Sequence, residues 1–226
     1  MATMNEMSVP AGGEAPTPRR RVRCTAEVRR RAILDAAMAV FLERGYAGAT
    51  IDAVVERAGG SKATVYAMFG NKEGLLAAII TDGVESLAET FDAAQVDAPL
   101  DETLRRIGLG YLRLITSPER VALFRLVVGE SGRFPEIGDI FYRSGPERGV
   151  KRLADYFRDA IARGLIVSDD AERLSVFFLD LLRGHLHLRA ILNATRRPTQ
   201  KEIEAHVDFI LPLFLKVCAC EAQAAD

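Results

Sequence analysis

The chain has 226 residues, of which 49% are hydrophobic and 27% are charged, with 18 Gly and 9 Pro. This composition is ordinary for a globular protein, and it excludes disordered, collagen-like and low-complexity chains. The 30 Lys and Arg nearly balance the 31 Asp and Glu, and the formal net charge of −1 by itself argues against nucleic-acid binding.

The charge, however, is unevenly distributed along the chain. Residues 19–74 hold 11 Lys and Arg against 6 Asp and Glu, a net of +5, whereas residues 75–226 hold 19 against 23, a net of −4. A small basic front therefore precedes a larger acidic rear. Such a front could bind DNA or an anionic membrane surface, and the charge alone leaves both open.

Cysteines and apolar runs indicate the compartment. Three Cys, with Cys218 and Cys220 only one residue apart, make a poor disulfide framework, so we expect a reducing environment. Two thiols fill only half of a zinc site, and we predict no metal. We find no membrane span and no signal peptide, which predicts a cytoplasmic protein without a membrane partner.

The first predicted elements are a tail and a long helix. Residues 1–18 are rich in Pro and Gly and are predicted to be disordered. Apolar residues then recur with the period of a helix over residues 26–44. Thr25 is the expected N-cap of this helix, and Gly45 its expected end.

Two short helices follow within the basic segment. Thr50 can cap a helix that ends near residue 58, and Ser61 can cap another over residues 62–69. Between them the glycines at 59–60 supply the positive φ of a tight turn. This arrangement predicts a helix-turn-helix, whose second helix presents its N-terminal side chains to base edges in the major groove of DNA.

The rest of the chain is predicted to be helical, because no alternating apolar pattern of any length occurs. The expected helices cover residues 71–94, 101–116, 118–131, a short stretch after Pro135, 147–163, 170–192 and 199–217. We therefore expect an all-α fold of about nine helices. A three-helix DNA-binding domain would precede a helical bundle.

Residues 25–80 resemble the TetR family of transcriptional regulators. The resemblance rests on Gly45, Tyr46, Thr50, Ile51, Ala58, Gly59, Ser61, Thr64, Tyr66, Phe69, Lys72, Glu73 and Leu75. Two positions depart from the family pattern, with Val55 in place of the usual Ala and Gly60 in place of the usual Val. Residues 123–136 resemble the C-terminal domain of AefR-like regulators. The resemblance implies a DNA-binding domain over residues 19–80 and an effector-binding and dimerisation domain over residues 81–226.

The resemblance also implies a set of DNA contacts. Phosphate contacts are expected from Thr50, Ser61, Tyr66 and Lys72, and base contacts from Lys62, Ala63 and Thr64. Tyr66 could instead be a core aromatic, and Lys72 a solvated residue that the helix dipole disfavours. The arginines between residues 19 and 23 could enter the minor groove or act only through their charge.

The rear domain offers candidates for an effector pocket and for a dimer interface. An apolar cavity for a lipophilic effector is expected from Phe124, Phe134, Phe141, Tyr142, Phe157, Phe177 and Phe178, although these aromatics could equally be plain core. A four-helix seam between two copies is expected from Leu174, Phe178, Leu181, His185, Leu188, Ile203, Val207, Ile210 and Phe214. The alternative is that both helices belong to the core of a monomer.

No constellation of side chains predicts an enzyme or a cofactor. His185 and His187 point in different directions on a helix and cannot bind one ion, and His206 is the only other His. The sequence therefore predicts a dimeric repressor that binds a palindromic operator and is released by a small apolar effector. The alternative is a helical interaction or membrane-surface protein with a basic front.

Overall fold

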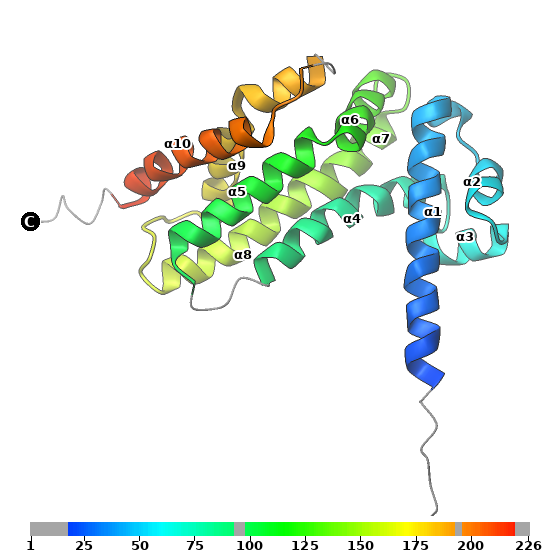
Figure 1. Ribbon diagram of the computed structural model, residues 1–226, viewed down its shortest axis with the longest axis horizontal. Helices are drawn as coiled ribbons and strands as arrows, with labels where there is room; N and C mark the ends of the chain where they lie inside the picture. The colour runs from blue at the N-terminus through cyan, green and yellow to red at the C-terminus, as the bar shows by residue number, and fades with distance from the viewer. Residues whose placement is uncertain (1–17, 93–97, 193–195, 220–226) are drawn as a thin grey trace, which may run out of the picture.

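A computed structural model describes the backbone of residues 18–92, 98–192 and 196–219, and the side chains of these ranges apart from 18–25, 87–92 and 219. Ten α-helices and one π-helical turn, with no strand, make up these described ranges (Figure 1). The prediction of an all-α fold is confirmed. Residues 1–17, predicted to be disordered, lie outside the described part of the chain.

The N-terminal unit contains α1 (Pro18–Gly48), α2 (Ile51–Ala58), α3 (Lys62–Phe69) and the start of α4 (Lys72–Asp92). The predicted helix start after Thr25 is wrong, because α1 begins earlier, at Pro18. Proline is favoured in the first turn of a helix, where its missing N–H is not needed, and no helix breaker follows it. The predicted end at Gly45 marks a true break, since this residue has φ 68°.

Both predicted caps of the short helices are confirmed. The Thr50 side chain accepts a hydrogen bond from the Ala53 N–H at 3.2 Å, and the Ser61 side chain accepts one from the Thr64 N–H at 3.2 Å. The turn between the helices uses the positive φ of Gly59 (71°) and Gly60 (93°). These local signals fix where α2 ends and where α3 begins.

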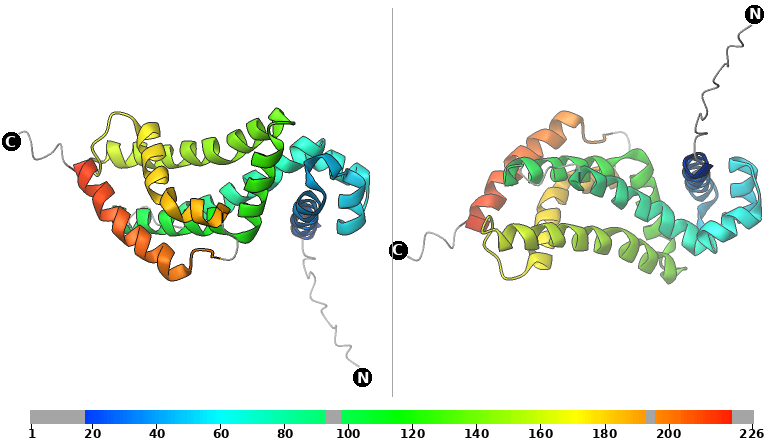
Figure 2. Two further views of the ribbon diagram at one scale, coloured as in Figure 1. Left: turned by 90° about the horizontal axis from the view of Figure 1, so that it is seen from above. Right: turned by 90° about the horizontal axis from the view of Figure 1, so that it is seen from below.

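The remaining helices form a bundle beside this unit (Figure 2). They are α5 (Leu100–Thr116), α6 (Pro118–Glu130), α7 (Pro135–Tyr142), the π-helical turn η1 (Arg143–Glu147), α8 (Arg148–Ala162), α9 (Ala171–Leu192) and α10 (Gln200–Ala219). The packing of α8 on α9 and of α5 on α10 is the most extensive. The rings of Phe157, Phe178 and Phe214 meet in the centre of this core and are fully buried.

A second core joins the N-terminal unit to the bundle. It contains apolar side chains of α1 to α4 and also Leu123, Val127 and Ile137 from α6 and α7. The ring of Phe134 lies edge-on to the ring of Tyr46, with 5.3 Å between their centroids. The N-terminal unit is therefore packed against the bundle and shares α4 with it, so the predicted domain boundary between residues 80 and 81 lies within a helix.

Helix α9 has a break that the sequence did not suggest. Gly184 has φ 39° and ψ −146°, outside the helical region. The His206 ring of α10 places its Nε2 atom 3.0 Å from the Leu182 carbonyl and 3.3 Å from the Leu181 carbonyl. A β-carbon at residue 184 would lie only 3.2 Å from this ring, so glycine allows the close approach.

Candidate functional site

The N-terminal end of α3 is the part of the helix-turn-helix that faces solvent. The side chains of Ser61, Lys62 and Ala63 are exposed, and that of Thr64 is partly exposed. On the opposite side of α3, Val65 is buried in the core and fixes the rotation of the helix. The four residues predicted to lie at the DNA-facing end therefore share one accessible surface.

Lys62 forms an ion pair within the unit. Its Nζ atom lies 2.7 Å from Oδ1 of Asp52 in α2, and both side chains are more than half exposed. The hydrogen bond to Asp52 raises the pKa of Lys62, so the ammonium stays charged at neutral pH. An exposed pair of this kind contributes little to stability. Its cation can therefore exchange Asp52 for an acceptor on DNA at small cost.

Tyr66 and Lys72 differ in their surroundings. The Tyr66 side chain is 51% exposed, so its assignment as a core aromatic is wrong. Lys72 is not simply solvated, since its Nζ donates to the Tyr46 carbonyl at 2.9 Å and lies 4.1 Å from the centre of the Tyr46 ring. An ammonium group has three hydrogens, and one bond leaves it able to donate to a phosphate.

Arg29 holds the turn of the helix-turn-helix, a role that the sequence did not reveal. Its guanidinium donates to the Gly59 carbonyl at 2.5 Å and lies 3.5 Å from the Ala58 carbonyl, at the end of α2. A β-carbon on residue 60 would lie 1.3 Å from Arg29 Nη2. The departure from the family pattern at Gly60 therefore makes room for this arginine. That departure was the signal in the sequence that could have indicated a special contact.

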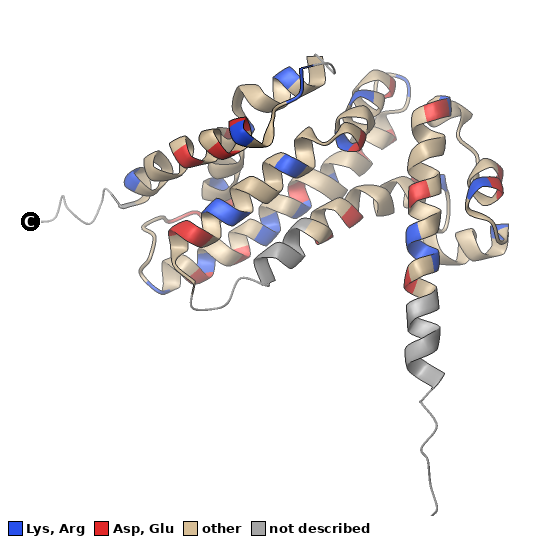
Figure 3. Ribbon diagram, in the orientation of Figure 1, with Lys and Arg blue, Asp and Glu red and all other residues tan. Residues whose placement is uncertain are grey.

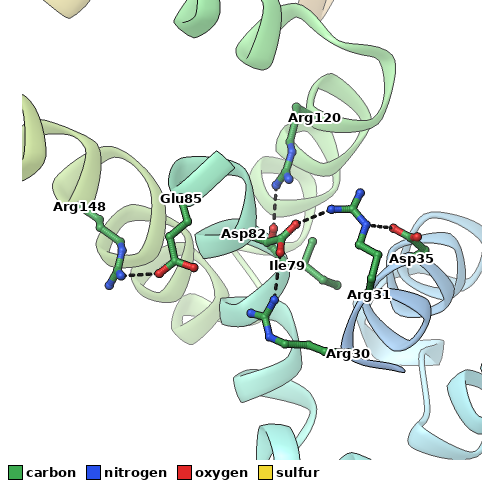
Figure 4. A network of polar contacts seen from close by, with 8 residues as sticks. All are labelled: Arg30, Arg31, Asp35, Ile79, Asp82, Glu85, Arg120 and Arg148. Atoms are coloured by element: carbon green, nitrogen blue, oxygen red, sulfur yellow. Dashed lines mark hydrogen bonds and ion pairs between the residues drawn. The ribbon is translucent and has the colours of Figure 1, made fainter. Parts of the chain in front are cut away.

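Arg30 and Arg31 join α1 to α4 (Figure 4). Their Nη1 atoms lie 3.0 Å and 2.9 Å from the two carboxylate oxygens of Asp82. Arg31 also pairs with Asp35 at 3.0 Å, and Arg120 of α6 donates to the Ile79 carbonyl of α4 at 2.8 Å. Although these two arginines belong to the basic front, their charges are balanced by carboxylates in this joint.

The charge of the basic front thus has a narrower origin than its composition suggests. Residues 26–74 contain seven Lys and Arg and six Asp and Glu, and the positive and negative residues are interspersed along the helices (Figure 3). The net positive charge comes mainly from the four arginines between residues 19 and 23. Their side chains lie outside the described residues, so the prediction for this arm stays a prediction.

A cavity of about 740 Å³ lies between α4 to α9 and η1. Three of the predicted pocket residues, Phe124, Phe141 and Tyr142, line it. The other four do not. Phe134 packs on the N-terminal unit, Phe157 and Phe178 fill the core of the bundle, and Phe177 is 42% exposed. These four predictions are corrected, because helical periodicity does not distinguish a cavity wall from a filled core.

The cavity also has a polar lining that the sequence did not single out, formed by Tyr111, Arg120, Ser131, Arg152, Asp180, Arg183 and His187. Arg183 donates to the Tyr111 hydroxyl at 3.1 Å and pairs with Asp180 at 3.3 Å. Burial lowers the pKa of His187 to about 4, so its ring is neutral at pH 7. In the sequence, Asp180 and Arg183 interrupt an otherwise apolar stretch of α9, and this could have indicated a polar site there.

The structure corrects five of the nine residues predicted for a dimer interface. The side chains of these five are buried within the chain, as expected if the two helices belong to the core of a monomer. They are Phe178, Ile203, Val207, Ile210 and Phe214. Leu174 and Leu181 are partly buried, and His185 and Leu188 are exposed. The apolar side chains that α9 and α10 do expose are largely different ones, including Phe177, Leu192, Phe209, Leu213 and Val217.

The described residues contain neither a metal cluster nor a membrane span. No group of three or more His, Cys, Asp or Glu among them is placed to hold a metal ion. None of their helices has the length and apolar character needed to cross a membrane.

Comparison with known proteins gives matches over both parts of the chain. Residues 33–79 match the family described as bacterial regulatory proteins, tetR family, and residues 102–219 match the AefR-like transcriptional repressor, C-terminal domain. An uncharacterized HTH-type transcriptional regulator of Mycobacterium tuberculosis is 29% identical over 79% of this chain and 84% of its own length.

Solved structures agree with these matches. A putative TetR-family regulator from Mesorhizobium loti aligns with a TM-score of 0.72 and 25% identity, over 85% of this chain and 97% of that one. The flavonoid-responsive regulator FrrA aligns with a TM-score of 0.67 and 36% identity, over the same shares of 85% and 97%. These relatives are named as regulators of transcription and not as enzymes.

Proposed function

The chain belongs to the TetR family of DNA-binding transcriptional regulators, and from this premise we propose that it is a ligand-responsive repressor. In this proposal a dimer binds a palindromic operator and releases it when a small, largely apolar effector fills the cavity. Because the chain belongs to this family, the alternative of a membrane-surface protein is set aside, and no observation favours that alternative.

The observation that carries the proposal is that α4 belongs to both functional parts. Leu75, Leu76 and Ile79 are buried in the core that holds the DNA-reading helices. One turn further along the same helix, Ile80 and Gly83 line the cavity. A ligand that moves this wall of the cavity must also move the base of the helix-turn-helix, because a packed helix shifts as a rigid element.

A dimer is supported by the exposed surface of α9 and α10. These helices expose the apolar side chains of Val176, Phe177, Leu188, Leu192, Phe209, Leu213 and Val217. This is a large set of exposed apolar side chains for two neighbouring helices, and a second copy of the chain would cover it. Two copies joined there would present two reading helices, which can reach half-sites about 34 Å or a multiple of it apart.

The cavity supports an effector with a flat aromatic body. Its volume of about 740 Å³ lies within the usual range for small-molecule sites. Phe124 and Phe141 both line the cavity and meet edge-on, with 5.6 Å between their centroids. The structural relative FrrA is named for its response to flavonoids. We propose a planar aromatic effector for this chain as well.

The test is selection of bound DNA from a random pool by the full-length protein, followed by gel-shift measurements on the selected site. We expect a palindromic consensus, an affinity that falls steeply with salt concentration, and release of DNA by planar aromatic compounds. Transcription from a promoter that carries the site should fall when the protein is present. Binding no tighter than to random DNA would overturn the operator, and activated transcription would overturn repression.

A further inference from the structure

Arg120 is a largely buried cation in the cavity wall that lacks an acidic partner. Its Nη1 donates to the Ile79 carbonyl at 2.8 Å, and its other N–H groups have no hydrogen bond to any residue in the described ranges. It forms no ion pair with these residues either. Burial lowers its pKa, because the charged form loses contact with water. A buried charge without a counter-charge is costly, so this guanidinium is prepared to receive an anion.

Asp82, the carboxylate that most favours the charged form of Arg120, is already paired with two other arginines. Each of its oxygens is bound by one of them, Arg30 or Arg31 (Figure 4). Asp35 compensates Arg31 at the surface, where its side chain is 62% exposed. Glu119 also favours the charged form of Arg120 but forms no ion pair with it in the described residues, so the guanidinium has no carboxylate in contact at this end of the cavity.

Gly83 seats the Arg120 guanidinium against α4. A β-carbon on residue 83 would lie 2.5 Å from Cζ and from Nη2 of Arg120, so only glycine permits this position. Both residues line the cavity. The arginine is thus held with its flat face at the wall, where its Nε and Nη2 hydrogens can serve a ligand that binds with two acceptor atoms.

The remaining charges of the cavity do not balance the charge of Arg120. Among the described residues of the lining, Asp180 is the only acidic one, and it pairs with Arg183. Arg152 also lines the cavity and has neither a hydrogen bond nor an ion pair with the described residues. His187 is neutral at pH 7. Most residues that line the cavity are therefore apolar, while the charged ones among them give it a net positive charge.

We propose that the effector is an anionic amphiphile whose acidic group binds Arg120, while its aromatic body lies along Phe124 and Phe141. The acidic group would be a carboxylate, a sulfonate or an ionised phenol. This inference rests on the proposed function, because it needs the cavity to be the effector site. It adds that a ligand of the same shape without the negative charge binds poorly.

The test uses two dyes that share one aromatic skeleton. The anionic dye is 8-anilinonaphthalene-1-sulfonate, and the neutral one, N-phenyl-1-naphthylamine, lacks only the sulfonate. The chain contains no Trp, so their fluorescence can be followed without energy transfer from indole. We expect the anionic dye to bind about tenfold more tightly or better, as a charge-assisted hydrogen bond provides.

Variants locate the binding and assign it to Arg120. Arg120→Met should weaken the anionic dye about tenfold or more and leave the neutral dye within about twofold. Gly83→Ala keeps the charge but displaces the guanidinium, and it should also weaken the anionic dye. Arg143→Met removes an exposed arginine outside the cavity and should change neither. At Gly149 a β-carbon meets no atom within 4 Å, so Gly149→Phe should fill the cavity and abolish both.

The outcomes separate this inference from the proposed function. Equal binding of the two dyes by the wild-type protein, or equal losses in Arg120→Met, would overturn the anionic class and leave an effector cavity in place. If neither dye binds, or if Gly149→Phe retains both, the cavity is not the site and the effector part of the proposed function fails as well.

Discussion

The DNA-reading helices and the bundle around the cavity are stabilised by different kinds of contact. Helices α2 and α3 have eight residues each, begin at the side-chain caps Thr50 and Ser61, and are joined by a turn that Arg29 holds. The bundle has longer helices, and its stability comes from fully buried aromatic rings such as Phe178 and Phe214. The reading helices are thus positioned by polar contacts at their ends in addition to an apolar core, whereas the bundle relies mainly on packing between long helices.

This difference has a consequence for regulation. The side-chain caps and the Arg29 contact lie within the reading unit and outside the cavity lining, so a ligand is expected to have little influence on the shape of α3 itself. The joint between the two regions consists instead of the Asp82 pairs and the shared helix α4. Effector binding is therefore expected to reposition the reading unit as a whole.

The largest expected effect separates neighbouring residues of α9. Phe178→Ala should lower the free energy of unfolding by about 3–5 kcal/mol, because it opens a cavity in the core of the bundle. Phe177→Ala removes the same ring from a side chain that is 42% exposed and should cost much less. Urea denaturation of both variants measures the difference. Equal losses would mean that the bundle is not stabilised by this core.

The next effect concerns the reading end. Lys62→Ala should weaken operator binding by about 1–3 kcal/mol and relax the preference at one base pair, while the unfolding free energy stays within about 0.5 kcal/mol. Gel-shift titration against the selected operator and its single-base variants measures this. Lys151→Ala, which removes an exposed lysine of α8 paired with Glu147, is the matched control and should leave the affinity unchanged.

A smaller effect is expected at the turn. Arg29→Met should destabilise the helix-turn-helix by about 1 kcal/mol, because the carbonyls at the end of α2 lose their donor. Hydrogen exchange should become faster in α2 and α3 and stay unchanged in α8. Arg57→Met is a suitable control, since it breaks only an exposed pair with Glu43. Faster exchange throughout the protein would show that Arg29 does not act locally.

The smallest effect is confined to acid. The Thr199 backbone N–H, with Arg189, lowers the pKa of Glu202 from its ordinary value of 4.5 to about 2. A carboxylate with a lowered pKa stabilises the folded state above its unfolded pKa, and this contribution is lost as the pH falls through about 2. Protection of the amides in the first turn of α10, measured relative to their intrinsic exchange rates at each pH, should therefore fall between pH 4.5 and pH 2.

The variant Glu202→Gln should show the faster exchange already at pH 7, with little further change in acid. Glu172→Gln, at an exposed position near the start of α9, removes a charge without touching this cap. If both variants behave alike, general charge and not the cap governs the acid response.

The difference between contacts within a few residues and contacts between distant segments also explains what could be predicted from the sequence. The caps at Thr50, Ser61 and Thr199 depend on residues three positions apart, so they could be read directly, and the helix-turn-helix with them. Which apolar side chains of α9 and α10 remain exposed could not be predicted, because both sides of these helices are apolar. The period of a helix does not say which side meets α5.

The polar side of the cavity was hidden for a related reason. Arg120, Arg152 and Arg183 are far apart in the sequence, and only the packing of α6, α8 and α9 brings them to one cavity. The role of Arg29 likewise depends on a residue 30 positions away. Such contacts have no local pattern that marks them.

The contact between Arg29 and Gly60 has a consequence for evolution. A β-branched residue at position 60 would displace the guanidinium and would be strained by the φ of 93°, so the two positions are expected to change together. Relatives that carry the usual Val at this position should lack an arginine at the position of Arg29, and relatives that keep the arginine should keep the glycine. Substitution histories of the two sites should be coupled, with Gly60 gained before the arginine and lost only after it.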